Sequence, residues 1–138
     1  YAWRQAGDAL ADIRVFVLYH DPALTPSVPH SLGLQKGLLG VVHGFAGPGR
    51  DGANAVVIAH EVLHALGATD KYDPRTGQPL WPDGYANPAA EPRHPQDMAE
   101  IMGGRIPLSV STAAIPDSLD DVVIGQRTAT EINWQPQP

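Results

Sequence analysis

The sequence predicts an α+β domain in which a small mixed sheet packs against one helix and a second helix lies near the C-terminus. Two runs rich in β-branched and aromatic residues, at residues 13–19 and 38–45, indicate strands. Residues 53–66 are almost wholly apolar and long enough for a helix. Residues 122–134 indicate the second helix. No internal repeat is visible, so we expect one domain that covers residues 1–138.

The two predicted strands differ in their surroundings. Residues 13–19 (IRVFVLY) are mostly apolar, which indicates a buried strand. Residues 38–45 (LLGVVHGF) carry glycines, which weaken a strand or let another backbone come close, and we expect this strand at the edge of the sheet. Three prolines make residues 20–31 a loop, and residues 46–52 form a Gly/Pro turn.

The predicted helix at residues 53–66 has an unusual composition. Asp51 or Asn54 is a candidate N-cap, and Gly67 is the expected stop. Apart from two histidines, Glu61 is its only ionisable residue, and apolar residues lie on nearly every side. Such a helix is expected to be buried.

The second half of the chain is irregular. Residues 71–97 hold six prolines and show no periodicity, and a loop of this length is usually functional or covers a site. Residues 98–104 indicate a short turn. The predicted helix at residues 122–134 has Gly125 inside it or at its start.

Composition limits the functions that the chain can have. A hydrophobic fraction of 43% allows a real core, and the net charge of -6 argues against nucleic acid, which needs a basic surface. The absence of cysteine excludes disulfides and thiolate ligands, so any metal must bind His, Asp or Glu. No run is long enough to span a bilayer.

The chain is expected to be a fragment of a longer protein. It begins with Tyr1, and residues 1–8 look like the end of an element cut by the boundary. The absence of a targeting signal therefore leaves the compartment open, and the sequence does not indicate an oligomeric state.

The strongest motif is His60-Glu61-Val62-Leu63-His64, the pattern HExxH. Residues four apart lie on one face of a helix, so His60 and His64 can share one metal ion. Glu61 lies beside them and can reach a metal-activated water. If these histidines were ordinary core residues, three polar groups would be buried on an apolar helix without partners, which is costly. A metal supplies the partner.

The motif extends to H-E-x-x-H-x-x-G-x-x-D. Gly67 can adopt the left-handed conformation that ends a helix, and this turn would bring Asp70 back toward the metal as third ligand. Asp73 and His94 are rival third ligands, although the glycine spacing favours Asp70. Asp73 and Asp83 could instead bind calcium, but the loop matches no established calcium pattern.

Residues 60–70 resemble the long zinc-binding motif of the metzincins, in the variant where aspartate replaces the third histidine, as in snapalysin-type bacterial proteases. The stretch HEVLHALGATDKYD is also similar to a group of bacterial proteins predicted to be metallopeptidases. The resemblance implies a metzincin-like fold, with the first helix carrying the active site and the C-terminal helix below the metal.

The resemblance also implies a Met-turn at Met102, with the methionine as an apolar floor beneath the metal. A core methionine in a loop is the simpler interpretation of this residue alone. The chain departs from better-known metzincins in its aspartate ligand, in its proline-rich segment and in having no tyrosine soon after Met102.

Several other residues were candidates for the site. Tyr72, Tyr85 and Arg105 could stabilise a tetrahedral intermediate, although exposed loop tyrosines are the simpler expectation. Glu100 was equally compatible with a partner to a ligand histidine and with a solvated loop carboxylate. The remaining histidines, at positions 20, 30 and 43, were expected at the surface, with His43 facing solvent or substrate.

Together these residues predict a zinc-dependent peptidase, most simply an endopeptidase, with one Zn²⁺ per chain and Glu61 as general base. An extended peptide or protein substrate would pair with the second strand, at Gly40, Val41, Val42, His43 and Gly44. Two alternatives stay open. One is a zinc-binding sensor or scaffold without turnover, and the other is a zinc amidase acting on non-protein amides.

Overall fold

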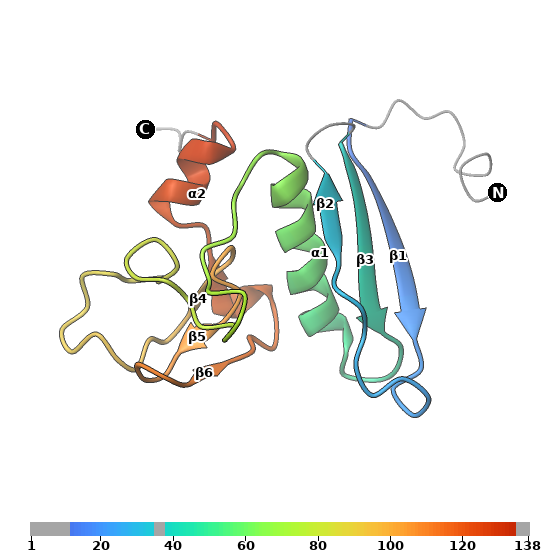
Figure 1. The fold of residues 1–138 in the computed structure, drawn as a ribbon, viewed down its shortest axis with the longest axis horizontal. Helices are drawn as coiled ribbons and strands as arrows, with labels where there is room; N and C mark the ends of the chain where they lie inside the picture. The colour runs from blue at the N-terminus through green and yellow to red at the C-terminus, as the bar shows by residue number, and fades with distance from the viewer. Residues whose placement is uncertain (1–11, 35–37, 135–138) are drawn as a thin grey trace.

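The fold is described from a computed structural model, shown in Figure 1, for residues 12–34 and 38–134. The element expected at residues 1–8 lies outside the described residues. The protein is a small mixed α+β structure with two α-helices and small sheets in this part of the chain, as the sequence predicts. No helix among the described residues is long and apolar enough to cross a membrane.

The main sheet has three strands, in the order β1-β3-β2. Strand β1 (Arg14–His20) runs parallel to β3 (Leu39–Phe45), and β2 (Leu32–Leu34) runs antiparallel to β3. The expected small mixed sheet is therefore present. The expectation that the second predicted strand lies at the edge is wrong, because β2, a three-residue strand that follows the proline-rich loop, covers that side of β3.

Strand β1 is not buried, in contrast to its apolar sequence. None of its residues is buried, and Leu18 and Tyr19 are 47% and 60% exposed. The reason is its position at the open edge of the sheet, whereas β3 in the centre has every second residue buried.

Helix α1 (Asp51–Ala65) packs on the sheet, mainly against β3 and β2, and its other side faces the C-terminal half of the chain (Figure 1). It begins three residues before Asn54, so neither expected N-cap is correct: Arg50 is the N-cap, and Asp51 is the first helical residue. Asn54 instead ties the helix to β3, accepting from Phe45 N at 3.1 Å and donating to Phe45 O at 2.8 Å. The helix is only partly buried, since Val57 is 36% exposed.

The C-terminal half contains only short strands and short helices. Strand β4 (Ala99–Glu100) pairs in parallel with β7 (Val122–Val123), and β5 (Ile106–Pro107) pairs antiparallel with β6 (Ala113–Ala114). A 3-10 helix, η2 (Leu119–Asp121), precedes β7.

Helix α2 (Gln126–Glu131) is shorter than predicted. The β-branched pair Val122 and Val123 forms strand β7 instead of a first helical turn, and Gly125 is the N-cap of α2. Residues 71–97 contain no helix and no regular strand, as expected, and two isolated bridges, Tyr72 to Pro79 and Tyr85 to Ala99, pin this segment.

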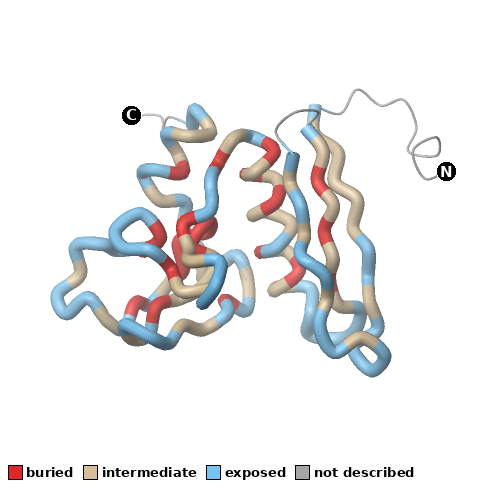
Figure 2. The backbone as a smooth tube through the Cα atoms, viewed as in Figure 1, coloured by how far each residue is buried: buried red, intermediate tan, exposed pale blue. Residues whose placement is uncertain are grey.

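The core lies where α1 meets the turn after β4. Figure 2 shows buried residues on α1, on β3 and in the middle of the C-terminal half. Leu63, Ala68, Ile101 and Met102 form one buried apolar cluster, and Met102 has no exposed surface. The helix thus has two packed sides, one on the sheet and one on this cluster.

Strand β2 approaches α1 very closely at Gly33. A Cβ added to Gly33 would lie 2.6 Å from His64 Cβ and closer still to the carbonyl oxygen of Glu61. Only glycine therefore lets β2 lie beside the helix segment that carries the two histidines.

The first prediction concerns this contact. We expect Gly33→Ala to destabilise the protein by roughly 1–3 kcal/mol, because the backbone atoms that the new methyl meets cannot move freely. Gly40→Ala, on the neighbouring strand, is the matched control, since its Cβ would meet Val15 at an ordinary 3.5 Å. Urea unfolding of the three proteins gives the free energies, and equal values for the two variants would contradict the close packing of β2.

Candidate metal centre

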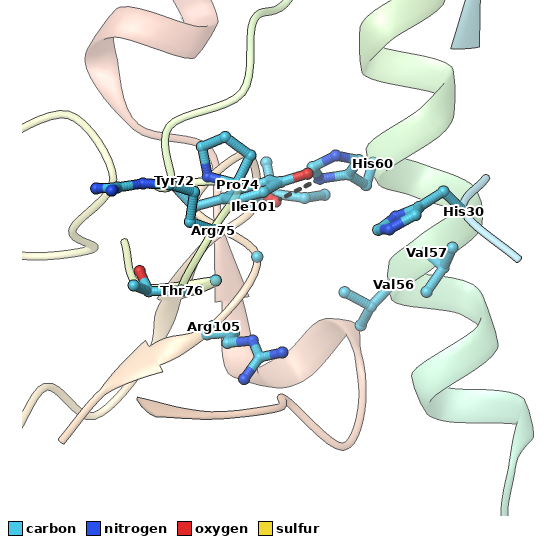
Figure 3. Close-up of a pocket in the computed structure, with 13 residues that line it drawn as sticks. His30, Val56, Val57, His60, Tyr72, Pro74, Arg75, Thr76, Ile101 and Arg105 are labelled. Carbon is cyan, nitrogen blue, oxygen red and sulfur yellow. Dashed lines mark hydrogen bonds between the residues drawn. The ribbon is translucent and has the colours of Figure 1, made fainter. Parts of the chain in front are cut away.

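Helix α1 presents His60 and His64 one turn apart, with their rings edge to face and 4.6 Å between centroids. Each Nδ1 is bonded to a backbone carbonyl: that of His60 to Ile101 O at 2.9 Å (dashed in Figure 3) and that of His64 to Ala68 O at 2.8 Å. A carbonyl oxygen can only accept, so Nδ1 carries the proton in both rings. In the neutral rings the Nε2 lone pairs are then free to bind a metal.

The turn after α1 brings Asp70 to these two nitrogens. Gly67 has a φ of 110°, its N–H donates to His64 O, and the N–H of Ala68 donates to Leu63 O. This pair of bonds is a Schellman motif, as the glycine predicts. Asp70 Oδ1 lies 3.2 Å from His60 Nε2 and 3.1 Å from His64 Nε2.

These three side chains could hold a metal ion. Their ligand atoms lie within 4.8 Å of one another, and no other group of three such residues occurs in the described part of the chain. Tetrahedral zinc with bonds of roughly 2.0–2.1 Å separates its ligand atoms by roughly 3.4 Å, close to the contacts of Asp70. Two imidazole nitrogens and one carboxylate oxygen are therefore placed for a single small cation.

The three side chains shift each other's pKa values. The hydrogen bond with Asp70 raises the pKa of His64, although burial opposes this. Burial alone would raise the pKa of Asp70, but hydrogen bonds and charge from His60 and His64 outweigh it and hold that pKa well below its ordinary value. Both shifts follow from the close contact between the carboxylate and the two imidazole rings.

Glu61 lies next to this group and is 5% exposed. Its Oε2 is buried and has no hydrogen-bond partner among the described residues. Burial raises the pKa of Glu61, while the charges of His60 and His64 oppose the rise. An unpartnered buried carboxylate oxygen is costly, so its position beside three ligand atoms needs a ligand or water to complete it.

The segment around Met102 supports the histidines from behind. Ile101 O holds His60, Met102 packs with Leu63 and Ala68, and Met102 O accepts from Lys71 N at 2.9 Å. An apolar methionine therefore lies in the cluster directly behind the helix turn and loop that carry His64 and Asp70.

Glu100 has neither of the roles expected for it. It has no exposed surface and contacts no ligand histidine. Its carboxylate accepts from Met102 N at 2.7 Å, Gly103 N at 2.8 Å, Gly125 N at 3.1 Å and Thr128 Oγ1 at 2.6 Å. It therefore joins the Met102 turn to the start of α2. The sequence does not predict this role, because Gly125 and Thr128 are distant from Glu100 in the sequence.

Asp73 and His94, the rival third ligands, form hydrogen bonds elsewhere. Asp73 is bonded to Arg75, and His94 Nε2 to Tyr85 Oη at 2.9 Å, so neither joins the group of three. Asp73 and Asp83 form no metal-binding cluster among the described residues. Tyr85 is buried in this pair and is not an exposed loop tyrosine.

A cleft opens in front of the three ligands. The part shown in Figure 3 has a volume of about 430 Å³ and lies between α1 and the segments at residues 72–77 and 101–105. His60, Tyr72 and Arg105 line it, together with the exposed His30. The adjoining part reaches Glu61, His64 and Asp70 and is bordered by β2.

The substrate-binding role expected of the second strand is not supported by the topology. Gly40, Val41, Val42 and Gly44 lie on central strand β3 and do not line the cleft, and Val42 is fully buried. Of the five residues only His43 borders it. His43 is also bonded to His20, Nδ1 to Nε2 at 2.9 Å, and its backbone N–H donates to Ser31 Oγ.

Comparisons with protein-family models, curated proteins and solved structures found no match to this chain. The function must therefore be inferred from the site itself.

A buried ion pair holds the loop that carries Asp70. Glu131 of α2 accepts from Thr69 N at 2.9 Å and from Lys71 Nζ at 2.8 Å, the residues on either side of Asp70. Burial alone would raise the pKa of Glu131, but these bonds lower it to about 2. The sequence offers no indication of this contact, because 60 residues separate Lys71 from Glu131.

The second prediction concerns this pair. Because the folded pKa of Glu131 is depressed from 4.5 to about 2, its contribution is complete above roughly pH 5 and is lost as the pH falls toward 2. At neutral pH we expect Glu131→Gln to cost on the order of 3 kcal/mol.

Unfolding measured from pH 7 to pH 2 tests this. The gap between the unaltered protein and Glu131→Gln should close on acidification, whereas Glu91→Gln, at an exposed carboxylate, should follow the unaltered protein throughout. A gap that does not change with pH would show that the charge of Glu131 contributes nothing.

Proposed function

We propose that this chain is a zinc-dependent peptidase in which His60, His64 and Asp70 hold the metal and Glu61 is the general base. One observation carries the proposal: three oriented ligand atoms meet beside a buried carboxylate with an unpartnered oxygen, at the edge of a cleft. A purely structural metal site needs no such carboxylate and fills its fourth position with protein.

The donor set favours zinc over harder cations. Two imidazole nitrogens and one carboxylate oxygen suit zinc in tetrahedral geometry with one position open. Calcium takes six to eight oxygen ligands, and magnesium is bound mainly by oxygens and water. Zinc bound here would act as a Lewis acid that polarises a carbonyl and activates water for attack.

The residues of the chain would then move the proton. Glu61 Oε2 is buried beside the ligands and accepts a proton from the attacking water. The same oxygen can then pass the proton to the leaving amine nitrogen. The uncharged Gln or Ala at this position could do neither.

Tyr72 is the residue best placed to assist. Its phenol O–H can donate a hydrogen bond. It lines both parts of the cleft, with its ring 6.4 Å from that of His60. We assign it the stabilisation of negative charge on the substrate carbonyl oxygen.

We propose that an extended substrate would lie along β2, and not along β3 as the sequence predicts. Strand β2 is the edge strand on the cleft side, and Leu32 and Gly33 line the cleft beside Glu61 and His64. Leu32 and Leu34 are 54% and 43% exposed, which leaves their side chains open to a bound peptide.

The third prediction concerns the metal. Protein purified without chelator should contain about one zinc per chain, and Asp70→Ala should weaken zinc binding by at least about 100-fold, more than loss of a supporting residue does. Asp73→Ala, three residues away and paired with Arg75, is the control and should bind as the unaltered chain does. Competition with a chromophoric chelator measures both. If only Asp73→Ala lost zinc, the assignment of Asp70 as third ligand would be wrong.

The fourth prediction separates enzyme from binding module. Glu61→Gln should retain zinc and fold, while peptide hydrolysis falls by at least about 100-fold, because glutamine cannot act as a base. The assay is cleavage of a mixed peptide library followed by mass spectrometry, with and without chelator.

Its outcomes distinguish the alternatives. If the zinc-loaded chain cleaves no peptide but hydrolyses small amides, it is an amidase. If it hydrolyses neither, a sensor or scaffold function replaces the proposal. Equal cleavage by the unaltered chain and Glu61→Gln would refute the role of Glu61.

A further inference from the structure

Arg105 lines both parts of the cleft, as His60 does. Figure 3 places its guanidinium across the cavity from His60, with Val56 and Val57 of α1 along the wall between them. Ile101 lines the same part of the cleft. A group entering from the metal side therefore passes an apolar wall before it meets a positive charge.

Arg105 is unpaired, in contrast to other arginines of the described chain. Arg75 and Arg127 bond to carboxylates, and Arg50 and Arg93 lie over aromatic rings. Among the described residues, no carboxylate lies within 4.0 Å of the Arg105 guanidinium and it makes no hydrogen bond.

The position of the guanidinium is nevertheless defined. Arg105 is half-buried, and a Cβ added at Gly77 would lie 3.3 Å from its Cζ, so the guanidinium packs against the Gly77 backbone. The protein carries a net charge of -6, yet no described residue pairs with this cation inside the cleft. A half-buried, oriented and unpaired guanidinium is suited to bind a carboxylate with two parallel hydrogen bonds.

We propose that Arg105 is a specificity residue that binds a substrate carboxylate, so that the cleft selects a residue with an aliphatic stem and an acidic end. This rests on the proposed function, since it names the substrate class of that site. Two sources share the chemistry, a glutamate side chain and the carboxylate at the end of a peptide chain. Figure 3 shows Arg105 on the opposite side of the cavity from His60, which separates this role from stabilisation of the oxyanion, assigned above to Tyr72.

The test uses binding, so it does not depend on turnover. Zinc-loaded Glu61→Gln protein is titrated with fluorescent peptide libraries that contain either Glu or Gln, each with a free or an amidated C-terminus. We expect the library with the carboxylate to bind about 10- to 100-fold more tightly, the effect of a charge-assisted hydrogen-bonded pair. Preference for Glu over Gln assigns a side chain, and preference for the free over the amidated end assigns the terminus.

Arg105→Gln, Arg105→Lys and Arg105→Glu in the same background identify the residue. Arg105→Gln should abolish the discrimination without changing affinity for the uncharged library, and Arg105→Lys should restore part of it. Arg105→Glu should reverse it toward peptides with Lys. Zinc affinity, measured in parallel, should be the same in all three, which excludes loss of the fold.

If the protein with Arg105 intact bound peptides with a carboxylate and peptides with an amide equally, the inference would be overturned, whether or not the enzyme is active. So would equal weakening of charged and uncharged peptides by Arg105→Gln, because that marks a structural role. Cleavage of the library without acidic preference overturns the inference alone and leaves the peptidase proposal intact. Arg105-dependent discrimination without any cleavage supports the carboxylate site and removes the peptidase proposal.

Discussion

The site depends on two hydrogen bonds from imidazole nitrogens to backbone carbonyls, one at Ile101 and one at Ala68. They decide which nitrogen of His60 and His64 carries the proton and where the other nitrogen points. They also join α1 to the turn that directly follows it at Gly67 and to the distant turn at Met102, and both turns must be in place for both bonds to form.

Within this arrangement Glu61 is the costly group, and the surrounding structure offsets that cost. Asp70 faces two imidazole nitrogens, and Glu61 keeps an oxygen without a partner among the described residues. Two other carboxylates, by contrast, have their charge well satisfied: Glu100 takes four donors at the Met102 turn, and Glu131 binds both neighbours of Asp70. Well-bonded carboxylates thus hold the elements that position a poorly bonded group, the division expected where function opposes stability.

The parts of the site that follow local rules could be predicted from the sequence. The spacing of His60 and His64 and the turn at Gly67 depend on helix geometry and on one left-handed residue, and the structure confirms both that turn and the approach of Asp70. Strand β2 could not be predicted, because its three residues are defined by pairing with β3 and not by their own propensity. The roles of Glu100 and Glu131 were missed for the same reason. Glu100 reaches Gly125, 25 residues away, and Glu131 reaches Thr69, 62 residues away.

The residues proposed for the reaction and the residues that form the cleft walls also differ in how far apart they lie in the sequence. The proposed metal ligands and the proposed base come from one helix and the turn after it, so a short motif contains them all. The cleft walls come from segments that meet only in the folded chain, residues 72–77 and 101–105 opposite α1. Arg105 has no distinctive sequence context, and only the absence of a described partner, beside an apolar wall, separates it from other surface arginines. The carboxylate partner proposed for Arg105 would come from outside the described residues, and the cleft in which Arg105 lies has room for it.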